Sequence, residues 1–344
     1  MKYKVTIADI AKELNVTPAT VSRALSNHPA ISLKTKQAVQ KTAGRLNYKK
    51  NTIAASLQSG KTNVIGVIIP SAEINFFGSV VHGIESIANQ NGYNVLIYQS
   101  NEDMRHEAKG IETFLSARVD GILASIAKNT VDFSHFLEVK ARNIPLVFFD
   151  RTNDDLGLPS VVIDDFKGAF LATEHLIKQG YKRIAHISAS QHISIWNTRL
   201  KGYKAALAAH NIPFDESLIY VGNISIKSGK EAVKYFFEKP NPPDAIFAVE
   251  DFTALGAIKE LKDRNIKIPG KVGVIGFANE HFGEHITPSL STVDQQTVLM
   301  GKESIKLLLE LISPKEKNKQ QNRKIILEPI PIFRESSMKK KKTL

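Results

Sequence analysis

The chain has 344 residues, 42% of them hydrophobic, which is enough to bury large cores in two or three domains. It has no cysteine and no apolar run near the roughly 18 residues of a membrane helix, which excludes a disulfide framework, thiolate chemistry and a transmembrane anchor. The net charge of +12 is concentrated at the amino terminus: residues 1–62 hold nine Lys and two Arg against Asp9 and Glu13, as is typical of a nucleic-acid-binding module.

The first predicted elements are two short helices within residues 4–26, separated by a tight turn. Thr6 is a suitable N-cap, and apolar residues recur at positions 7, 10, 11 and 14, which is the spacing of one helical face. Thr17 is a second N-cap, and Pro18 follows at the first helical position, where its missing N–H costs nothing. The segment therefore predicts two helices joined by a turn.

The outer face of the second predicted helix carries small and polar side chains instead of the Glu and Lys of a solvated helix. These are Thr17, Ala19, Thr20, Ser22 and Arg23. Small side chains let a helix lie close to another surface, and Thr, Ser and Arg can bind phosphates and base edges. The pattern favours a recognition helix in the DNA major groove. The alternative is a plain helical hairpin packed on its own domain.

Residues 6–25 resemble the amino terminus of the lactose-repressor family of bacterial transcription regulators. They read TIADIAKELNVTPATVSRAL, against the family pattern T-I-x-D-[VI]-A-x-x-x-x-V-[ST]-x-x-T-V-S-R-x-L. The resemblance implies that Pro18 and Ala19 hold the specificity positions, that Arg23 reads a base, and that Thr20 and Ser22 contact phosphates or bases. The further DNA contacts that we expect are Thr6, Thr17, Asn27 and Tyr48.

A third predicted helix begins after Ser32, with apolar positions at 39, 43 and 46 and with Tyr48 at the edge of the small core. Residues 51–60, NTIAASLQSG, then resemble the hinge helix of the same family. Such a helix is too short to persist alone, and the family resemblance implies that it folds when two copies pair in the minor groove. Asn51 would cap it, Ala54 would allow close pairing, and Leu57 would wedge between base pairs. The alternative is an ordinary flexible linker.

The rest of the chain alternates apolar runs of strand length with helical patterns. Predicted strands are 64–69, 93–98, 121–124, 145–149, 161–163, 183–187, 218–221, 245–249, 272–277 and 291–293; predicted helices are 77–89, 107–117, 196–210, 227–238 and 253–264. Alternation of this kind predicts two doubly wound α/β subdomains with parallel sheets. It resembles the periplasmic sugar-binding fold that follows the head in the same family. We thus expect a small all-α helix-turn-helix domain followed by a periplasmic-binding-protein-like α/β region.

The expected boundaries are 1–50 for the head, 51–61 for the hinge, 62–344 for the effector-binding and dimerisation region, and 338–344 for a basic tail. The first subdomain would take 62–163 plus 295–323, and the second 164–294 plus 324–337. Ligands of parallel sheets bind beyond the carboxyl ends of the strands, so a small molecule should lie in the cleft between the subdomains.

The family resemblance also implies the residues that line this cleft: Phe76, Phe77, Ser125, Asp150, Arg199, Glu250, Asn279 and Gln295. An aromatic ring would stack on a sugar face, and Arg199 would bind hydroxyls or a carboxylate through its planar fork. Ala278 stands where the family often has an aspartate that grips two sugar hydroxyls, and Asn279 would partly replace it. With that carboxylate missing and Arg199 present, the sequence favours an acidic ligand over a neutral hexose.

The sequence shows no catalytic set, no phosphate loop and no metal-spaced histidine cluster, so we expect no enzyme activity, cofactor or metal. His281 and His285 flank Gly283 in a predicted loop, which we expect at the cleft rim. We expect a cytoplasmic homodimeric repressor that binds a pseudo-palindromic double-stranded operator and responds to a small sugar or sugar acid, with no membrane partner. The alternatives are a solute-binding protein and a sugar-processing enzyme.

Overall fold

The computed structural model describes residues 5–49, 60–189, 194–313 and 323–339. The chain divides into two compact units, Met1–Thr62 and Asn63–Leu344. None of the helices in the described ranges combines the length and apolarity that a membrane span requires.

The first unit contains helices α1 (Ile7–Glu13), α2 (Pro18–Leu25) and α3 (Leu33–Arg45), as the sequence predicts. Each helix begins at a polar residue that satisfies free backbone N–H groups. The Asp9 carboxylate accepts hydrogen bonds at 2.8 Å from both the backbone N–H and the hydroxyl of Thr6. Thr17 and Ser32 each accept a backbone N–H three residues later, at 3.2 Å.

The predicted apolar positions of these helices meet in one small core. Its buried members are Ile10, Ala11, Val21, Ala24, Val39 and Ala43, and Tyr48 packs partly buried against them. The spacing of the apolar residues therefore determines which faces of α1, α2 and α3 turn inwards and leaves the opposite face of α2 outside.

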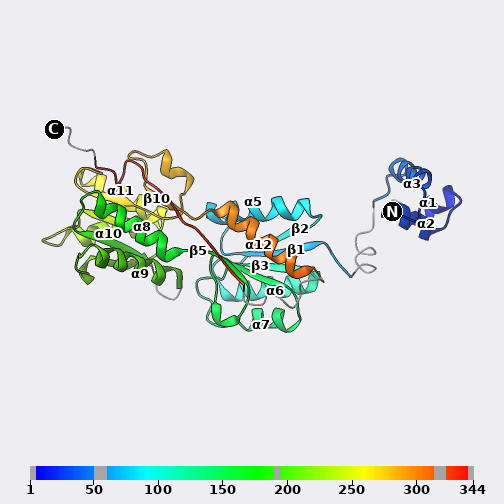
Figure 1. The fold of residues 1–344 in the computed structure, drawn as a ribbon, viewed down its shortest axis with the longest axis horizontal. Coiled ribbons are helices and arrows are strands. Elements are labelled where there is room, and N and C mark those ends of the chain that lie inside the picture. Colours follow the sequence, from blue (N-terminus) through cyan, green and yellow to red (C-terminus); the bar gives the residue numbers. More distant parts are fainter. Residues whose placement is uncertain (1–4, 50–59, 190–193, 314–322, 340–344) are drawn as a thin grey trace. The chain divides into compact units, whose positions relative to one another are not determined.

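The second unit begins with a six-stranded sheet in the order β11-β5-β4-β3-β1-β2, in which all the pairings are parallel. Its strands are β1 (Val64–Ile69), β2 (Asn94–Gln99), β3 (Gly121–Ala124), β4 (Leu146–Phe149), β5 (Ser160–Ile163) and β11 (Lys324–Leu327). Helices α5 (Asn75–Gln90) and α12 (Thr297–Ile312) cover one face, and α6 (Met104–Ala117) and α7 (Ser134–Ala141) cover the other (Figure 1).

The second sheet has four parallel strands in the order β7-β6-β8-β9. They are β6 (Ile184–Ala189), β7 (Ile219–Gly222), β8 (Ala245–Ala248) and β9 (Gly273–Ile275). Helices α8 (Asp165–Lys178) and α9 (Ser194–Ala209) pack on one face, and α10 (Ile226–Phe237) and α11 (Asp251–Asp263) on the other. The short 3-10 turns are η1 (Asp154–Leu156), η2 (Glu216–Leu218) and η3 (His281–Glu284).

Two differences from the sequence prediction concern the path of the chain between the sheets. Residues 324–327, expected in the second subdomain, form β11 and pair with β5 in the first sheet, because their apolar side chains complete its edge. The predicted strand 291–293 is β10 (Thr292–Asp294), which pairs antiparallel with β12 (Ile330–Ile332) and touches the second sheet only through isolated bridges. The chain thus passes between the two sheets after β5, after β10 and after β11.

Candidate functional site

The predicted recognition face of α2 is exposed to solvent. Thr17, Pro18, Ala19 and Arg23 are exposed, and Thr20 and Ser22 are half-buried. The hydroxyl of Thr17 already lies 2.9 Å from that of Thr20, so part of its hydrogen-bonding capacity serves the N-cap. The backbone oxygen of Arg23 accepts hydrogen bonds from Ser26 and His28, whereas its guanidinium has no partner among the described residues and can reach outwards.

Both acidic residues of the head have partners within the head. Asp9 binds Thr6, and these hydrogen bonds hold the pKa of Asp9 below its usual value. Glu13 forms an ion pair with Arg45, which joins α1 to α3. Among the other exposed cations of the described head, Arg23, Lys34, Lys41 and Lys49 form no ion pair with Asp9 or Glu13. A surface with this imbalance attracts a polyanion.

The remaining predicted DNA contacts have different environments. Thr6 is committed to capping α1, and Asn27, at φ 57°, accepts a hydrogen bond on its backbone oxygen from Lys36 Nζ at 3.2 Å. Tyr48 lies half-buried at the edge of the core. Asn51, Ala54 and Leu57 of the predicted hinge lie outside the described residues.

In the second unit, a cavity of about 220 Å³ lies between the two subdomains. Its walls are mostly apolar and aromatic, with a few charged groups. The lining residues are Ile74, Phe76, Phe77, Asp150, Arg151, Ile195, Trp196, Arg199, Ile224, Ser225, Ile226, Glu250, Phe252, Ala278, Glu280 and Gln295. Most belong to the ends of strands and the starts of helices, as parallel-sheet topology requires.

Three carboxylates line this cavity. Asp150, directly after β4, has its pKa raised to about 6 by burial, against the opposing effect of Arg151. Glu250 caps α11 and accepts the N–H of Phe252 at 2.8 Å, while burial and then the nearby Asp251 raise its pKa to about 8. Burial also raises the pKa of Glu280, although hydrogen bonds from Asn75 and the Phe76 backbone oppose the shift.

The two arginines of the cavity are already neutralised by residues behind its wall. Arg199 donates from Nε to Asp165 Oδ1 at 2.8 Å, and its guanidinium lies 3.6 Å from the centre of the Phe277 ring. Arg151 donates to Glu102 at 2.7 Å. Three acidic groups thus line the cavity, and each of its two guanidinium groups is already paired with a carboxylate.

A second network behind the cavity fixes the loop that carries Glu280. Asp251 is fully buried and accepts the Thr292 hydroxyl at 2.8 Å on one oxygen and the Glu280 N–H at 2.8 Å on the other. Burial raises the pKa of Asp251 to about 7. The start of α11, strand β10 and the Glu280 loop are thus joined at one carboxylate.

Six of the eight predicted cleft residues line the cavity: Phe76, Phe77, Asp150, Arg199, Glu250 and Gln295. Two do not. Ser125 lies behind the wall with its hydroxyl 3.4 Å from Asp150. Asn279 turns away, because its amide donates to Asp294 at 2.9 Å and its oxygen accepts from Arg334 at 3.1 Å. The idea that Asn279 replaces the missing carboxylate is therefore wrong, and Glu280 supplies a carboxylate from the next position.

Sequence reasoning missed Glu280, Arg151, Trp196 and Phe252 on the cavity wall. A signal existed for Trp196, which precedes Arg199 by three residues and so shares its face of α9. Phe252 follows Glu250 directly, at the start of α11. No local signal separates Glu280 from Asn279, because the choice depends on which side chain the loop turns inwards.

Comparison with known proteins gives two family matches. Residues 6–51 match the family described as "Bacterial regulatory proteins, lacI family", and residues 62–335 match "Periplasmic binding proteins and sugar binding domain of LacI family". The transcriptional regulator DegA of Bacillus subtilis is 34% identical over 335 residues, covering 97% of this chain and 98% of DegA.

Two solved structures have the same fold. The regulator CelR in complex with cellobiose is 26% identical with a TM-score of 0.72, covering 96% of this chain and 99% of CelR. The second structure is the lac repressor dimer bound to operator and the anti-inducer ONPF, with a TM-score of 0.87. The match covers 98% of this chain and 100% of the repressor chain. At 24% identity, this second likeness concerns the fold alone.

Proposed function

This chain belongs to the LacI family of bacterial regulatory proteins. We propose that two copies bind a pseudo-palindromic operator, and that a small hydroxylated molecule in the cavity between the sheets sets the affinity. It is a DNA-binding transcriptional regulator with a helix-turn-helix head and a periplasmic-binding-protein-like body. The single observation that carries the proposal is that one chain joins a basic helix-turn-helix head to a cavity lined by buried acidic groups.

In the proposed complex, α2 lies in the major groove. Pro18 and Ala19 have no side-chain donor, so they would contact thymine methyl groups, and Arg23 would supply the directional hydrogen bonds to a base. Lys34 and Lys41 on α3 are suited to phosphates, which position the head without reading sequence. Asn51, Ala54 and Leu57 would form the paired hinge in the minor groove, a proposal that rests on the sequence alone.

The charges of the cavity favour a ligand that donates hydrogen bonds. Asp150, Glu250 and Glu280 accept hydrogen bonds, whereas Arg199 and Arg151 are held by Asp165 and Glu102. The acidic ligand that the sequence favoured would meet these three acidic groups and two arginines that are already paired. We therefore propose a neutral or amine-bearing ring with several hydroxyl groups, whose apolar face would lie against the aromatic side chains of the wall.

The proposed route from ligand to hinge uses the three passages of the chain between the sheets. Gln295 lines the cavity and lies between β10 and α12, on one of these passages. A ligand that binds one relative arrangement of the subdomains better than another shifts the equilibrium between them, by a coupling free energy that is typically about 1–3 kcal/mol. The same shift would favour or prevent pairing of the hinges.

The experiment that tests the proposal combines duplex selection with ligand screening. The full chain should select a pseudo-palindromic duplex from a random pool and bind it as a dimer in a gel-shift assay. Neutral sugars and amino sugars are then added singly, and one of them should change the apparent affinity at least fivefold. A chain that stays monomeric and shows no preference among duplexes at moderate salt would contradict the proposal.

Homologous regulators are not enzymes, and we propose that this chain likewise binds its ligand without converting it. Asp150 and Glu250 serve as wall and cap residues, and Glu250 already accepts the N–H groups of Phe252 and Thr253. Prolonged incubation of the protein with the sugar that changes its DNA affinity, followed by mass spectrometry, should return the sugar unchanged. A product formed in proportion to the protein concentration would favour the alternative of a sugar-processing enzyme.

A further inference from the structure

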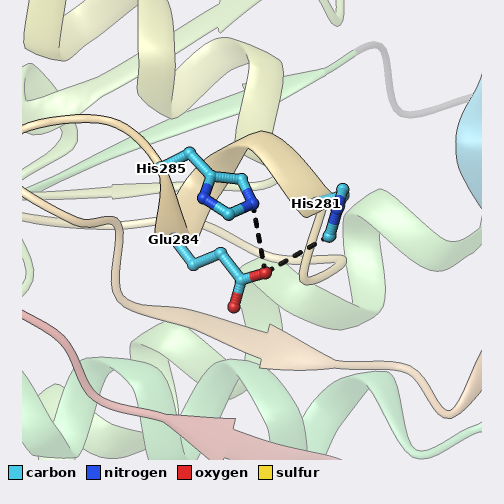
Figure 2. Close-up of side chains that lie close together, drawn as sticks. All are labelled: His281, Glu284 and His285. Carbon is cyan, nitrogen blue, oxygen red and sulfur yellow. Dashed lines mark ion pairs between the residues drawn. The ribbon is translucent and has the colours of Figure 1, made fainter.

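A cluster of two histidines and one glutamate lies on the turn that follows Glu280. Figure 2 shows His281, Glu284 and His285 converging from η3 and the residue after it. Glu284 Oε1 lies 3.4 Å from His281 Nδ1 and 3.4 Å from His285 Nε2. The three potential ligand atoms all lie within 4.8 Å of one another. The expectation that the sequence lacks a metal-spaced histidine cluster is therefore wrong at this turn.

The spacing of these atoms fits a small divalent ion. Zinc binds imidazole nitrogen and carboxylate oxygen at about 2.0–2.2 Å in tetrahedral geometry, which places neighbouring ligand atoms about 3.3–3.6 Å apart. Both Glu–His distances already have this value. The imidazole rings lie edge to face with their centres 5.0 Å apart, so a modest rotation of either exposed ring would bring the third pair into range.

The geometry points to a transition-metal site, and we propose that His281, Glu284 and His285 bind a divalent ion of the zinc, nickel or copper class. Two imidazoles favour these ions over calcium and magnesium, which prefer oxygen ligands. The three side chains are 79%, 48% and 66% exposed, so water would complete the coordination shell. This proposal does not depend on the identity of the ligand in the cavity.

The turn holds its shape through contacts that do not need an ion. Within it, the N–H of Gly283 donates to the Glu280 oxygen at 2.9 Å, and that of His285 donates to the Phe282 oxygen at 3.0 Å. The N–H of Leu290 donates to the Gly283 oxygen at 2.7 Å. Binding would then order side chains and leave the backbone unchanged, which lowers its entropic cost.

The position of the cluster connects it to the cavity. Glu280, immediately before the turn, lines the cavity, and the Phe282 ring packs at 5.0 Å against that of Phe252, which also lines it. A bound ion would cross-link the two ends of η3 and so restrain the loop that carries Glu280.

The test uses the untagged full chain, stripped of metal with a chelator that is then removed. Zinc is titrated against a chromophoric chelator, and one equivalent should bind. His281→Ala and His285→Ala should each weaken this binding at least tenfold, and Glu284→Gln should weaken it less. The matched control is His106→Ala, which removes an exposed histidine outside the cluster and should leave zinc affinity unchanged.

Copper(II) provides an independent readout, because its electron paramagnetic resonance spectrum reports nitrogen ligands directly. The wild-type spectrum should show coupling to two imidazole nitrogens, and each single histidine variant should show one. Thermal unfolding without metal checks that the variants fold. The proposal is overturned if the His281→Ala, His285→Ala double variant binds zinc as tightly as the wild type, or if the wild type binds none.

Discussion

Arg199 and Asp165 form an ion pair with a 2.8 Å hydrogen bond in which the side chains are only 3% and 9% exposed. The pair joins α9 to α8, and Arg199 Nη1 also donates to the Val249 backbone oxygen at 2.6 Å. The guanidinium that the sequence identifies as a ligand-binding fork is thus mainly a support of the cavity wall. This arrangement has consequences for stability as well as for ligand choice.

Replacing Arg199 by Met should destabilise the protein strongly, because Asp165 is left as a buried carboxylate without its partner. Breaking a buried ion pair in this way typically lowers the free energy of unfolding by about 3–5 kcal/mol. Urea unfolding would measure this loss. The single variant Asp165→Asn should also be destabilised. The double variant Asp165→Asn, Arg199→Met should lose less unfolding free energy than the two single variants together. Arg142→Ala, which breaks the exposed pair with Glu138, is the control and should cost less than about 1 kcal/mol. Simple additivity would contradict this account.

Glu250→Gln should change how the stability of the unliganded protein depends on pH. The pKa of Glu250 is raised from 4.5 to about 8, so its stabilising contribution is present below pH 4.5 and is lost as the pH rises through 8. Gln retains an acceptor for the Phe252 N–H and does not ionise. The melting temperature of the variant relative to the wild type should therefore rise between pH 5 and 9.

Asp251 and Glu280 titrate near Glu250 and remain in the variant, so only the difference between the two proteins is diagnostic. Glu112→Gln, at an exposed site on α6, is the matched control and should give a nearly constant difference. A constant difference for Glu250→Gln as well would show that this carboxyl group does not titrate abnormally.

His186→Phe should reduce the sensitivity of the fold to acid. His186 is fully buried between the rings of Tyr203 and Phe247, and burial lowers its pKa from 6.5 to about 3. Its contribution is present above pH 6.5 and is lost as the pH falls towards 3, because the unfolded chain binds the proton first. The free energy of unfolding, measured between pH 7 and 4, should fall less steeply in the variant. Parallel curves for the two proteins would refute this.

Arg23→Ala and Lys41→Ala should weaken DNA binding in different ways. Losing the base contact of Arg23 should reduce discrimination between the selected duplex and a scrambled one by about 1–3 kcal/mol. Losing a phosphate contact of Lys41 should weaken binding to both duplexes alike. It should also reduce the slope of the logarithm of the binding constant against the logarithm of the salt concentration by about one. Fluorescence anisotropy at several salt concentrations measures both quantities. Lys128→Ala, an exposed cation of the second unit, is the control. Equal loss on both duplexes for Arg23→Ala would remove its proposed role.

The cavity should bind a neutral sugar or an amino sugar more tightly than the matched sugar acid. A carboxylate on the ligand would face Asp150, Glu250 and Glu280 while both arginines are occupied. Thermal-shift screening followed by calorimetry measures the ranking at pH 9, above the pKa of about 8 to which burial raises Glu250. A sugar acid that binds at least as tightly as its neutral parent would restore the ligand class that the sequence favoured.

Much of this protein could be predicted from short stretches of sequence. Thr6, Thr17 and Ser32 cap the three helices of the head because each meets free N–H groups within its own turn. Apolar runs such as Val64–Ile69 become strands buried on both faces. The α/β alternation and the position of a cleft could therefore also be predicted. These features depend on neighbours a few residues apart, which the sequence displays directly.

The tertiary structure alone decided which groups become partners. Asp165 neutralises Arg199 from 34 residues away, and β11 joins β5 across more than 160 residues of sequence. Ala278 and Asn279 have positive φ angles of 121° and 55°. In the loop that they begin, the side chain of Glu280, and not that of Asn279, lines the cavity. Local periodicity determines whether a segment becomes a helix or a strand. Burial and charge pairing between distant segments determine which side chains remain free to bind a ligand. No short window of the sequence contains both members of such a pair.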